Sequence, residues 1–387
     1  MTTTPPEARV QIVNMVRDFV NREVEPVAAE HDREDTIPYD LIDRMKELGL
    51  FGITVPEEYG GMGLDYTTFA SIFEELSKGF MTLSGAIGTH HILTYVLTHY
   101  GTEEQKQRFL PDLASGRKRG GLALTEPSGG TDMANLQTTA TKDGEEYSIN
   151  GTKMFITNGR SGDMFCLLAR TDPDMEPRHK GISCFVVEKG GSGFHVGKDL
   201  DKLGYRGLDT SELIFNNFAV PENNLIGGKE GAGFGMVMSG LETGRINIAA
   251  RAVGVAQAAF EAAIKYSQQR ETFGKPISEH QAIQLKLADM ATKIQAARLL
   301  VYDAAAKKDT GQRVDLESGM AKLFASEVCL EVAMESMRVH GGVGYIKDSP
   351  VERYYRDAPL MVIGEGTNEV MRLVIAKQLL RLPEYQL

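Results

Sequence analysis

Apolar residues recur every three to four positions through residues 10–113, a spacing that predicts helices with one buried face. The periodicity is clearest at residues 12–20 and again at 69–76. Pro26, Pro38 and the glycine-rich stretch 56–63 predict breaks between these helices. We therefore expect an N-terminal helical domain over residues 1–119.

The pattern changes between residues 120 and 228, where short runs of β-branched and aromatic residues alternate with Gly, Asn and Asp. Such runs lie at residues 146–157, 164–169, 182–187 and 212–216 and predict strands. Asn150-Gly151 is typical of a two-residue hairpin turn between strands. A middle, antiparallel β domain is therefore expected over residues 120–228.

Long, alanine-rich helical patterns return at residues 236–270, 280–309, 314–340 and 366–381. Gly274, Pro276 and Gly311 mark short connections, which predict an antiparallel four-helix bundle in a C-terminal domain over residues 229–387. The expected fold class is α+β and mainly α, with helical, β and helical domains in that order. Because strands and helices are segregated along the chain, a doubly wound dinucleotide fold is disfavoured.

Composition excludes several classes of function. The 387 residues are 42% hydrophobic and carry a net charge of -11, so there is no basic surface for nucleic acid. Cys166, Cys184 and Cys329 form no CxxC pair and no HExxH motif occurs, which disfavours a metal site and favours buried thiols. No apolar stretch approaches the roughly 20 residues of a membrane span, and the N-terminus lacks the features of a secretory signal. A cytoplasmic protein is expected, with a processed mitochondrial matrix form left open.

One acidic residue is a candidate catalytic group. Glu365 lies between two glycines in an apolar run near the C-terminus. Burial would raise its pKa toward neutrality, where a general base works best, and the glycines would let a ligand approach the backbone closely. The alternative is a solvated glutamate in a loop between two helices, and the motif alone favours neither interpretation.

The glycine-rich segments fit neither common nucleotide fingerprint, because Met236 and Lys347 stand where GxGxxG needs glycine. Four other segments combine glycine with hydroxyl, aromatic or basic residues, at 122–132, 155–159, 270–276 and 337–345. Each alone is better explained as an ordinary turn or hairpin. Together they favour a large ligand with polar rings or phosphates that touches several segments.

Five motifs stand in a recognisable order. They are Leu124-Thr-Glu-Pro-Ser-Gly-Gly-Thr-Asp132, Asn150-Gly-Thr-Lys-Met-Phe-Ile-Thr-Asn158, Arg270-Glu-Thr-Phe-Gly274, His340-Gly-Gly-Val-Gly344, and Arg356-Asp357 followed by Glu365-Gly-Thr-Asn368. With this helical, β and helical layout, the chain resembles an acyl-CoA dehydrogenase over essentially its whole length.

The resemblance implies a homotetramer, built as a dimer of dimers, with one FAD per subunit between the β domain and the bundle. The implied flavin contacts are Leu122, Leu124, Thr125, Gly130, Thr131, Phe155 and Thr157. The adenosine half of FAD would reach a neighbouring subunit at Arg270, Phe273, Gln281, Arg338, Gly341 and Gly342, and Thr367 and Asn368 would close the site. Positions that touch the acyl-CoA substrate in the family match Thr131, Glu242, Arg245 and Gly366.

The resemblance also implies a reaction. Glu365 would remove the pro-R α-proton of the acyl-CoA thioester while the β-hydrogen leaves as hydride to flavin N5, which gives a trans-2-enoyl-CoA. Hydrogen bonds to the thioester oxygen from the FAD ribityl 2′-hydroxyl and the Glu365 N–H would stabilise the developing negative charge. The electrons would pass to an electron-transferring flavoprotein.

Departures from the family pattern bear on base and substrate. Gly244 occupies the position, one before Arg245, that carries the base in some branches, so Glu365 is the correctly placed candidate. Phe155 stands where many relatives have Trp, and Arg338 where Gln is frequent.

Two further departures concern the acyl chain. Gly364 replaces a frequent Tyr, which resembles branched-chain members and favours a branched or bulky acyl group. Met81 stands where glutaryl-CoA enzymes carry Arg, so a dicarboxylic acyl chain lacks its expected counter-ion there. Two rival functions stay open, namely a same-fold flavin oxidase or monooxygenase and a catalytically silent acyl-CoA-binding protein.

Overall fold

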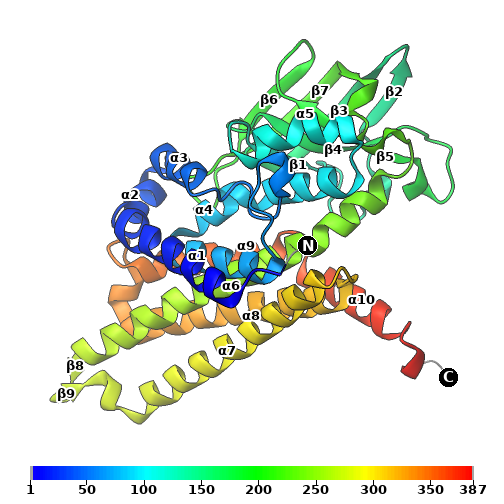
Figure 1. Cartoon of the computed structure of the whole chain (residues 1–387). Helices are drawn as coiled ribbons and strands as arrows, with labels where there is room; N and C mark the ends of the chain where they lie inside the picture. Colours follow the sequence, from blue (N-terminus) through cyan, green and yellow to red (C-terminus); the bar gives the residue numbers. More distant parts are fainter. Residues whose placement is uncertain (1–2, 386–387) are drawn as a thin grey trace.

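In the computed structural model, which describes residues 3–385, a β sheet lies at one end of a group of long, closely packed helices (Figure 1). The order of helical, β and helical parts along the chain confirms the predicted fold class. None of the described helices is both long and apolar enough to cross a membrane. The three cysteines are free and buried, as predicted.

The N-terminal part is helical. Its helices are α1 (Pro6–Phe19), α2 (Glu25–Glu34), α3 (Tyr39–Glu47), α4 (Tyr66–Tyr100) and α5 (Glu103–Ala114). The predicted break at Pro26 is wrong, because a π-helical turn at Val20–Val24 joins α1 to α2 and Pro26 lies in the first turn of α2. A proline is tolerated there, and the helix instead ends at Asp35, whose φ of 52° is left-handed.

Helix α4 is the central element of this part. The side chain of Asp65 caps its first turn by accepting from the Thr68 N–H, and most of its 35 residues are buried. Phe80 interrupts the helix with extended backbone angles. Helix α4 packs along the long helix α6 (Gly233–Gln269), and this contact forms one wall of the site described below.

The middle part is a seven-stranded sheet with the path β1-β4-β2-β3-β7-β6, and β5 pairs with β4 outside this path. Its strands are β1 (Gly120–Ala123), β2 (Thr139–Asp143), β3 (Glu146–Thr157), β4 (Met164–Arg170), β5 (Ile182–Glu188), β6 (Phe194–Asp199) and β7 (Thr210–Pro221). Most pairs are antiparallel, as predicted, and β4 pairs in parallel with β1 and β2. The strands contribute a second hydrophobic core, which is separate from the main helical core.

The hairpin predicted at Asn150-Gly151 is wrong. These two residues lie inside β3, where the register with β7 shifts, and the turn that joins β2 to β3 follows Asp143 and contains Gly144 at a φ of 63°. The physical reason is space, because a Cβ on Gly151 would lie 2.5 Å from Thr138 Oγ1. Glycine is needed there for a bulge under a neighbouring segment and not for a turn.

The C-terminal part contains α6, α7 (Gln281–Asp309), α8 (Asp315–His340), α9 (Pro350–Ile363) and α10 (Asn368–Leu379). Between α6 and α7 lies the two-stranded hairpin of β8 (Glu271–Thr272) and β9 (Lys275–Pro276). The prediction of four helices missed α9. Two of its buried positions are charged, Arg353 and Asp357, and these residues hide the apolar periodicity that marks the other helices.

Candidate active site

Glu365 lies in the four-residue connection between α9 and α10. Its φ of 54° is in the left-handed region that a side chain rarely adopts, and Gly366 follows at 97°. The hydroxyl of Thr367 then caps α10 by accepting from the Val370 N–H at 3.4 Å. This backbone turns the Glu365 side chain inward, toward α6.

The carboxyl group of Glu365 is in a dry environment. The residue as a whole is half-buried, but its Oε2 atom is out of contact with solvent and has no hydrogen-bond partner among the described residues. Burial raises the pKa of Glu365 to about 7, although Arg251, Lys322 and Arg245 act in the opposite direction. A carboxyl group with a pKa near neutrality suits proton abstraction at physiological pH.

Gly244 of α6 faces this carboxylate. A Cβ on Gly244 would lie 1.9 Å from Glu365 Oε2, far inside any real contact distance. The residue just before Arg245 and the C-terminal glutamate therefore reach the same region from opposite sides. The glycine at 244 leaves space for the carboxylate of Glu365.

Lys322 of α8 holds the connection that carries Glu365. Its buried ammonium group donates to the carbonyl oxygens of Val362 at 3.1 Å and Gly366 at 2.7 Å, and to Asn368 Oδ1 at 2.9 Å. Desolvation lowers the pKa of Lys322 to about 8, while the charge of Glu365 acts in the opposite direction. One side chain thus fixes both ends of the left-handed turn.

The sheet presents an aromatic ring and hydroxyl groups near this turn. Phe155 lies at an irregularity of β3 with a φ of 61°, and 60% of its surface is exposed. Thr157 follows on the same strand and pairs with Thr210 of β7, whose buried hydroxyl has no partner in the described part of the chain. The Met154 N–H donates to the Thr125 carbonyl, which joins this strand to the segment that follows β1.

The structure divides the predicted site residues into two groups (Figure 1). One group lies on β1 or shortly after it, on β3, on α6 or in the segment that begins at Glu365, and consists of Leu122, Leu124, Thr125, Gly130, Thr131, Phe155, Thr157, Glu242, Arg245, Gly366, Thr367 and Asn368. The other group lies on or near β8, β9 and the end of α8, at the opposite end of the molecule, and consists of Arg270, Phe273, Gln281, Arg338, Gly341 and Gly342. A single chain does not bring the two groups together.

Exposure distinguishes the distant group. Phe273 is 97% exposed at a left-handed turn between β8 and β9, and Gln281, Arg338, Gly341 and Gly342 are exposed as well. A large aromatic side chain that is almost fully exposed is a common feature of surfaces that bind another molecule. These residues therefore have the properties of a surface that meets another molecule.

Three predicted ligand contacts are engaged inside the protein. Glu242 is fully buried and forms ion pairs with Lys308 at 2.8 Å and with Arg313. Arg245 pairs with Asp315 at 3.0 Å. Asn368 is 1% exposed and bonds to Lys322 and Ser326, so its contact with a cofactor stays a prediction.

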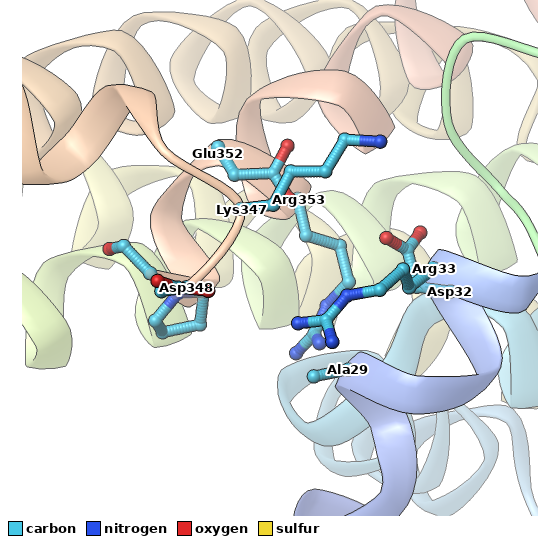
Figure 2. Close-up of a pocket in the computed structure, with 9 residues that line it drawn as sticks. Ala29, Asp32, Arg33, Lys347, Asp348, Glu352 and Arg353 are labelled. Atoms are coloured by element: carbon cyan, nitrogen blue, oxygen red, sulfur yellow. The ribbon is translucent and has the colours of Figure 1, made fainter.

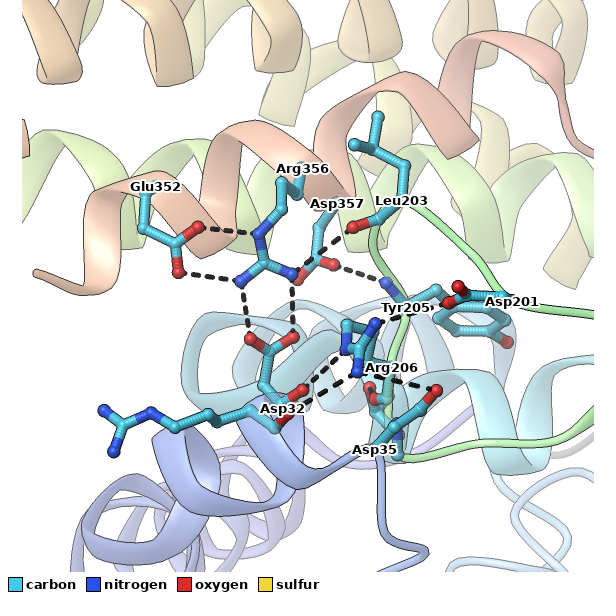
Figure 3. A network of polar contacts seen from close by, with 12 residues as sticks. Asp32, Asp35, Asp201, Leu203, Tyr205, Arg206, Glu352, Arg356 and Asp357 are labelled. Carbon is cyan, nitrogen blue, oxygen red and sulfur yellow. Dashed lines mark hydrogen bonds and ion pairs between the residues drawn. The ribbon is translucent and has the colours of Figure 1, made fainter. Parts of the chain in front are cut away.

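A polar network ties the segment after β6 to α9 (Figure 3). Arg356 of α9 bonds to Asp32 of α2 and to Glu352, and Asp357 accepts from the Tyr205 N–H at 2.6 Å. Burial raises the pKa of Asp357 to about 6. This network fixes Tyr205, which has a φ of 59°, next to the site.

A small cavity of about 100 Å³ lies elsewhere, between α2 and the start of α9 (Figure 2). Its lining includes Arg33 and Asp32 from α2 and Lys347 and Arg353 from the other side. None of the predicted site residues lines it.

Three residues at the site were missed by sequence reasoning, namely Lys322, Arg251 and Tyr205. Lys322 and Arg251 are charged residues at buried positions of otherwise apolar helices, and this was the available signal. Tyr205 lies in a loop between two strands and gave no signal of its own.

Comparison with known proteins identifies this arrangement. Three domains of one family match in order, namely "Acyl-CoA dehydrogenase, N-terminal domain" at residues 6–117, "middle domain" at 121–218 and "C-terminal domain" at 231–380. The chain belongs to the acyl-CoA dehydrogenase family. The boundaries predicted at residues 119 and 228 stay a prediction.

Individual relatives agree with this assignment to the acyl-CoA dehydrogenases. An acyl-CoA dehydrogenase of Bacillus subtilis is 47% identical over 97% of this chain and 98% of its own length. The butyryl-CoA dehydrogenase of Megasphaera elsdenii has a TM-score of 0.93 at 39% identity, over 98% of this chain and 100% of the other. A chain in a structure described as the electron transferring flavoprotein of Acidaminococcus fermentans has a TM-score of 0.94 at 45% identity, over 99% and 100% of the two chains.

Acyl-CoA dehydrogenases are FAD-dependent flavoenzymes, so FAD is the cofactor to be accommodated. The residues present fit it. The exposed ring of Phe155 and the hydroxyls of Thr157 and Thr210 on paired strands offer a flat apolar surface with polar groups beside it, as an isoalloxazine ring requires.

Proposed function

We propose that the chain catalyses the α,β-dehydrogenation of an acyl-CoA thioester to the trans-2-enoyl-CoA with Glu365 as the base. The observation that carries this proposal is the desolvated, unbonded carboxylate on a left-handed turn, with a pKa of about 7. FAD, when bound, supplies the acceptor for the hydride that leaves the β-carbon.

The residues of the chain prepare the proton transfer. Glu365 takes the α-proton on its carboxylate, and Lys322 fixes the carbonyls on both sides of the turn so that the carboxylate keeps its position. The Glu365 N–H would donate to the thioester oxygen, and loss of one such donor typically costs about 3 kcal/mol of barrier. Burial around Gly244 keeps water away from the transferred proton.

The proposed cofactor and substrate contacts are those implied by the family pattern. FAD would meet Leu122, Leu124, Thr125, Gly130, Thr131, Phe155, Thr157, Thr367 and Asn368 of one subunit, and Arg270, Phe273, Gln281, Arg338, Gly341 and Gly342 of its neighbour. Acyl-CoA would meet Thr131, Glu242, Arg245 and Gly366. The separation of the two FAD groups within one chain supports a site completed by a second subunit, and the family pattern implies the homotetramer that we propose as the assembly.

The similarity to a butyryl-CoA dehydrogenase supports a short acyl chain, and the branched-chain interpretation of Gly364 stays a prediction. The similarity to a chain solved under the name of an electron transferring flavoprotein supports such a flavoprotein as electron acceptor. A cytoplasmic location is retained as part of the proposal.

The test is anaerobic titration of the purified flavoprotein with short acyl-CoA thioesters. The flavin absorbance should bleach with the wild type, whereas Glu365→Gln should bind the thioester and stay yellow. A Glu365→Gln variant that bleaches at the wild-type rate would exclude Glu365 as the base.

The two rival functions give different results in the same titration. Stoichiometric hydrogen peroxide in air would indicate an oxidase. Absence of FAD from the purified protein would indicate a silent acyl-CoA-binding protein. The fit of Phe155, Thr157 and Thr210 to a flavin argues against the second rival.

A further inference from the structure

Arg251 of α6 is a buried cation without a carboxylate partner. The residue is 3% exposed, and its Nε and Nη2 groups have no hydrogen-bond acceptor among residues 3–385. The Tyr205 ring lies 5.1 Å from the guanidinium carbon, which is a weak substitute for an anion. A permanently charged group in this environment is costly unless an anion meets it.

A second unsatisfied group lies one turn away on the same helix. Asn247 is 1% exposed, and neither its amide oxygen nor its amide nitrogen has a partner in the described chain. Both side chains converge on Gly88 of α4, because a Cβ there would lie 2.9 Å from Asn247 Nδ2 and 3.6 Å from Arg251 Nη1. Two adjacent buried polar groups that lack partners indicate a ligand that supplies the missing hydrogen-bond partners.

These groups belong to the reacting site. Gly244, Asn247 and Arg251 are three and four residues apart, so they share one face of α6. Gly244 touches the Glu365 carboxylate, and Tyr205 interacts with Thr157 on the sheet side and with Arg251 and Glu365 on the helix side. The face therefore runs from the Glu365 carboxylate to the unpartnered groups of Asn247 and Arg251.

The neighbouring acids do not neutralise Arg251. Glu365 forms no ion pair within 4 Å in the described structure, and its carboxylate must stay free to take a proton. Lys322 and Arg245 add further positive charge around the same turn. Arg245 is paired with Asp315, so Lys322 and Arg251 are two cations around one carboxylate, an excess that favours an anionic ligand.

We propose that Arg251, with Asn247, binds a carboxylate at the far end of the acyl group, so that the substrate is the CoA thioester of a short dicarboxylic acid. This inference rests on the proposed function and specifies its substrate class. It gives a dicarboxylic acyl chain a counter-ion from α6, although Met81 on α4 provides none. The oxidised bond stays the α,β bond. Glu365 would receive the proton, FAD, when bound, would supply the hydride acceptor, and the distal carboxylate would keep its charge.

The experiment compares acyl-CoA pairs that differ only in their terminal group. Succinyl-CoA is matched with butyryl-CoA and glutaryl-CoA with valeryl-CoA, each replacing a methyl by a carboxylate. We expect the better dicarboxylic substrate to exceed its partner in kcat/KM by at least about 100-fold, because a site built for a charged group rejects an analogue that leaves it unpaired. Calorimetric binding to the Glu365→Gln holoenzyme should show the same preference without turnover.

Arg251→Gln separates recognition from structure, because glutamine keeps polar contacts and removes the charge. Removal of the Arg251 charge also acts on Glu365, and it does so for every substrate, so the ratio of kcat/KM values is the informative quantity. The variant should lower the ratio of kcat/KM for the dicarboxylic thioester to kcat/KM for butyryl-CoA by about 100-fold, mainly through KM of the dicarboxylic thioester. Flavin content and melting temperature report whether the variant is folded. If the variant does not fold, the comparison of the two substrate pairs with the wild type and the calorimetry on Glu365→Gln test the inference.

Faster turnover of butyryl-CoA than of succinyl-CoA, and of valeryl-CoA than of glutaryl-CoA, by the wild type would overturn the inference and leave the proposed function intact. Equal losses on both classes in a folded Arg251→Gln variant would also overturn it and assign Arg251 a structural role. Failure of every thioester to bleach the flavin would reject the proposed function, and the inference with it.

Discussion

Substitution of Gly244 by alanine should impair catalysis through a single added methyl group. Its Cβ would lie 1.9 Å from Glu365 Oε2, so the carboxylate would have to move by about 1.5 Å to reach the 3.4 Å of an ordinary contact. Displacement of a reacting group by roughly 1 Å costs about 100-fold in rate. We expect the rate of flavin reduction in Gly244→Ala to fall by about 100-fold, or about 2.7 kcal/mol of barrier.

The assay is stopped-flow flavin bleaching under anaerobic conditions at saturating acyl-CoA, which isolates chemistry from binding. Gly235→Ala is the matched control, because it makes the same change on the same helix at a position with no neighbour of its Cβ within 4 Å. Alanine favours a helix over glycine by up to about 1 kcal/mol, so neither variant should unfold for lack of helix propensity.

The control should reduce flavin at the wild-type rate. A Gly244→Ala enzyme within about threefold of the wild type would refute the reasoning, since the carboxylate would then not occupy the position in contact with α6. Equal slowing in both variants would also contradict it, because the effect would then come from the helix and not from the contact.

Four further predictions concern the buried charges. The bleaching rate should rise with pH through about 7 and then level off, because Glu365 must be ionised to accept a proton, and a pH-independent rate would contradict its assignment as base. Between about pH 4.5 and 7, folded Glu365 holds a proton that the unfolded chain has released, so the stability of the wild type falls as pH rises through that window. Glu365→Gln lacks this titration. The difference in unfolding free energy between Glu365→Gln and the wild type, measured by denaturant titration, should therefore shift in favour of the variant by up to about 3 kcal/mol between pH 4 and pH 8. Lys322→Met should lower the bleaching rate while its FAD content stays near the wild-type value, because the hydrogen bonds to Val362 and Gly366 are lost, and an unchanged rate would exclude the positioning role. Asp32→Asn should destabilise the fold by about 3 kcal/mol, because Arg356 loses a buried partner, and a melting temperature equal to the wild type would show that Glu352 alone suffices.

The sequence predicted the order of domains, and it singled out Glu365 as the candidate base, for identifiable reasons. Long α-helices with apolar periodicity, such as α6 and α8, and strands rich in β-branched residues carry local signals that tertiary contacts do not override. Glu365 was recognisable because a charge in an apolar run between glycines is unusual. The local signal failed at Asn150-Gly151, where the glycine serves a neighbouring segment and not a turn.

The environment of the base was less accessible to sequence reasoning, because it is assembled from distant helices. Arg251, Lys322 and Glu365 lie on α6, on α8 and after α9, and their mutual influence depends on how these helices pack. In the sequence, each cation alone only interrupts an apolar helical pattern.

Around one carboxylate the same cations acquire two different functions. Lys322 donates its three hydrogen bonds to the turn and therefore fixes geometry, whereas Arg251 keeps two nitrogen atoms, Nε and Nη2, without an acceptor and is therefore free to bind a ligand. The satisfaction of hydrogen bonds, more than charge or proximity, distinguishes a positioning residue from a recognition residue at this site.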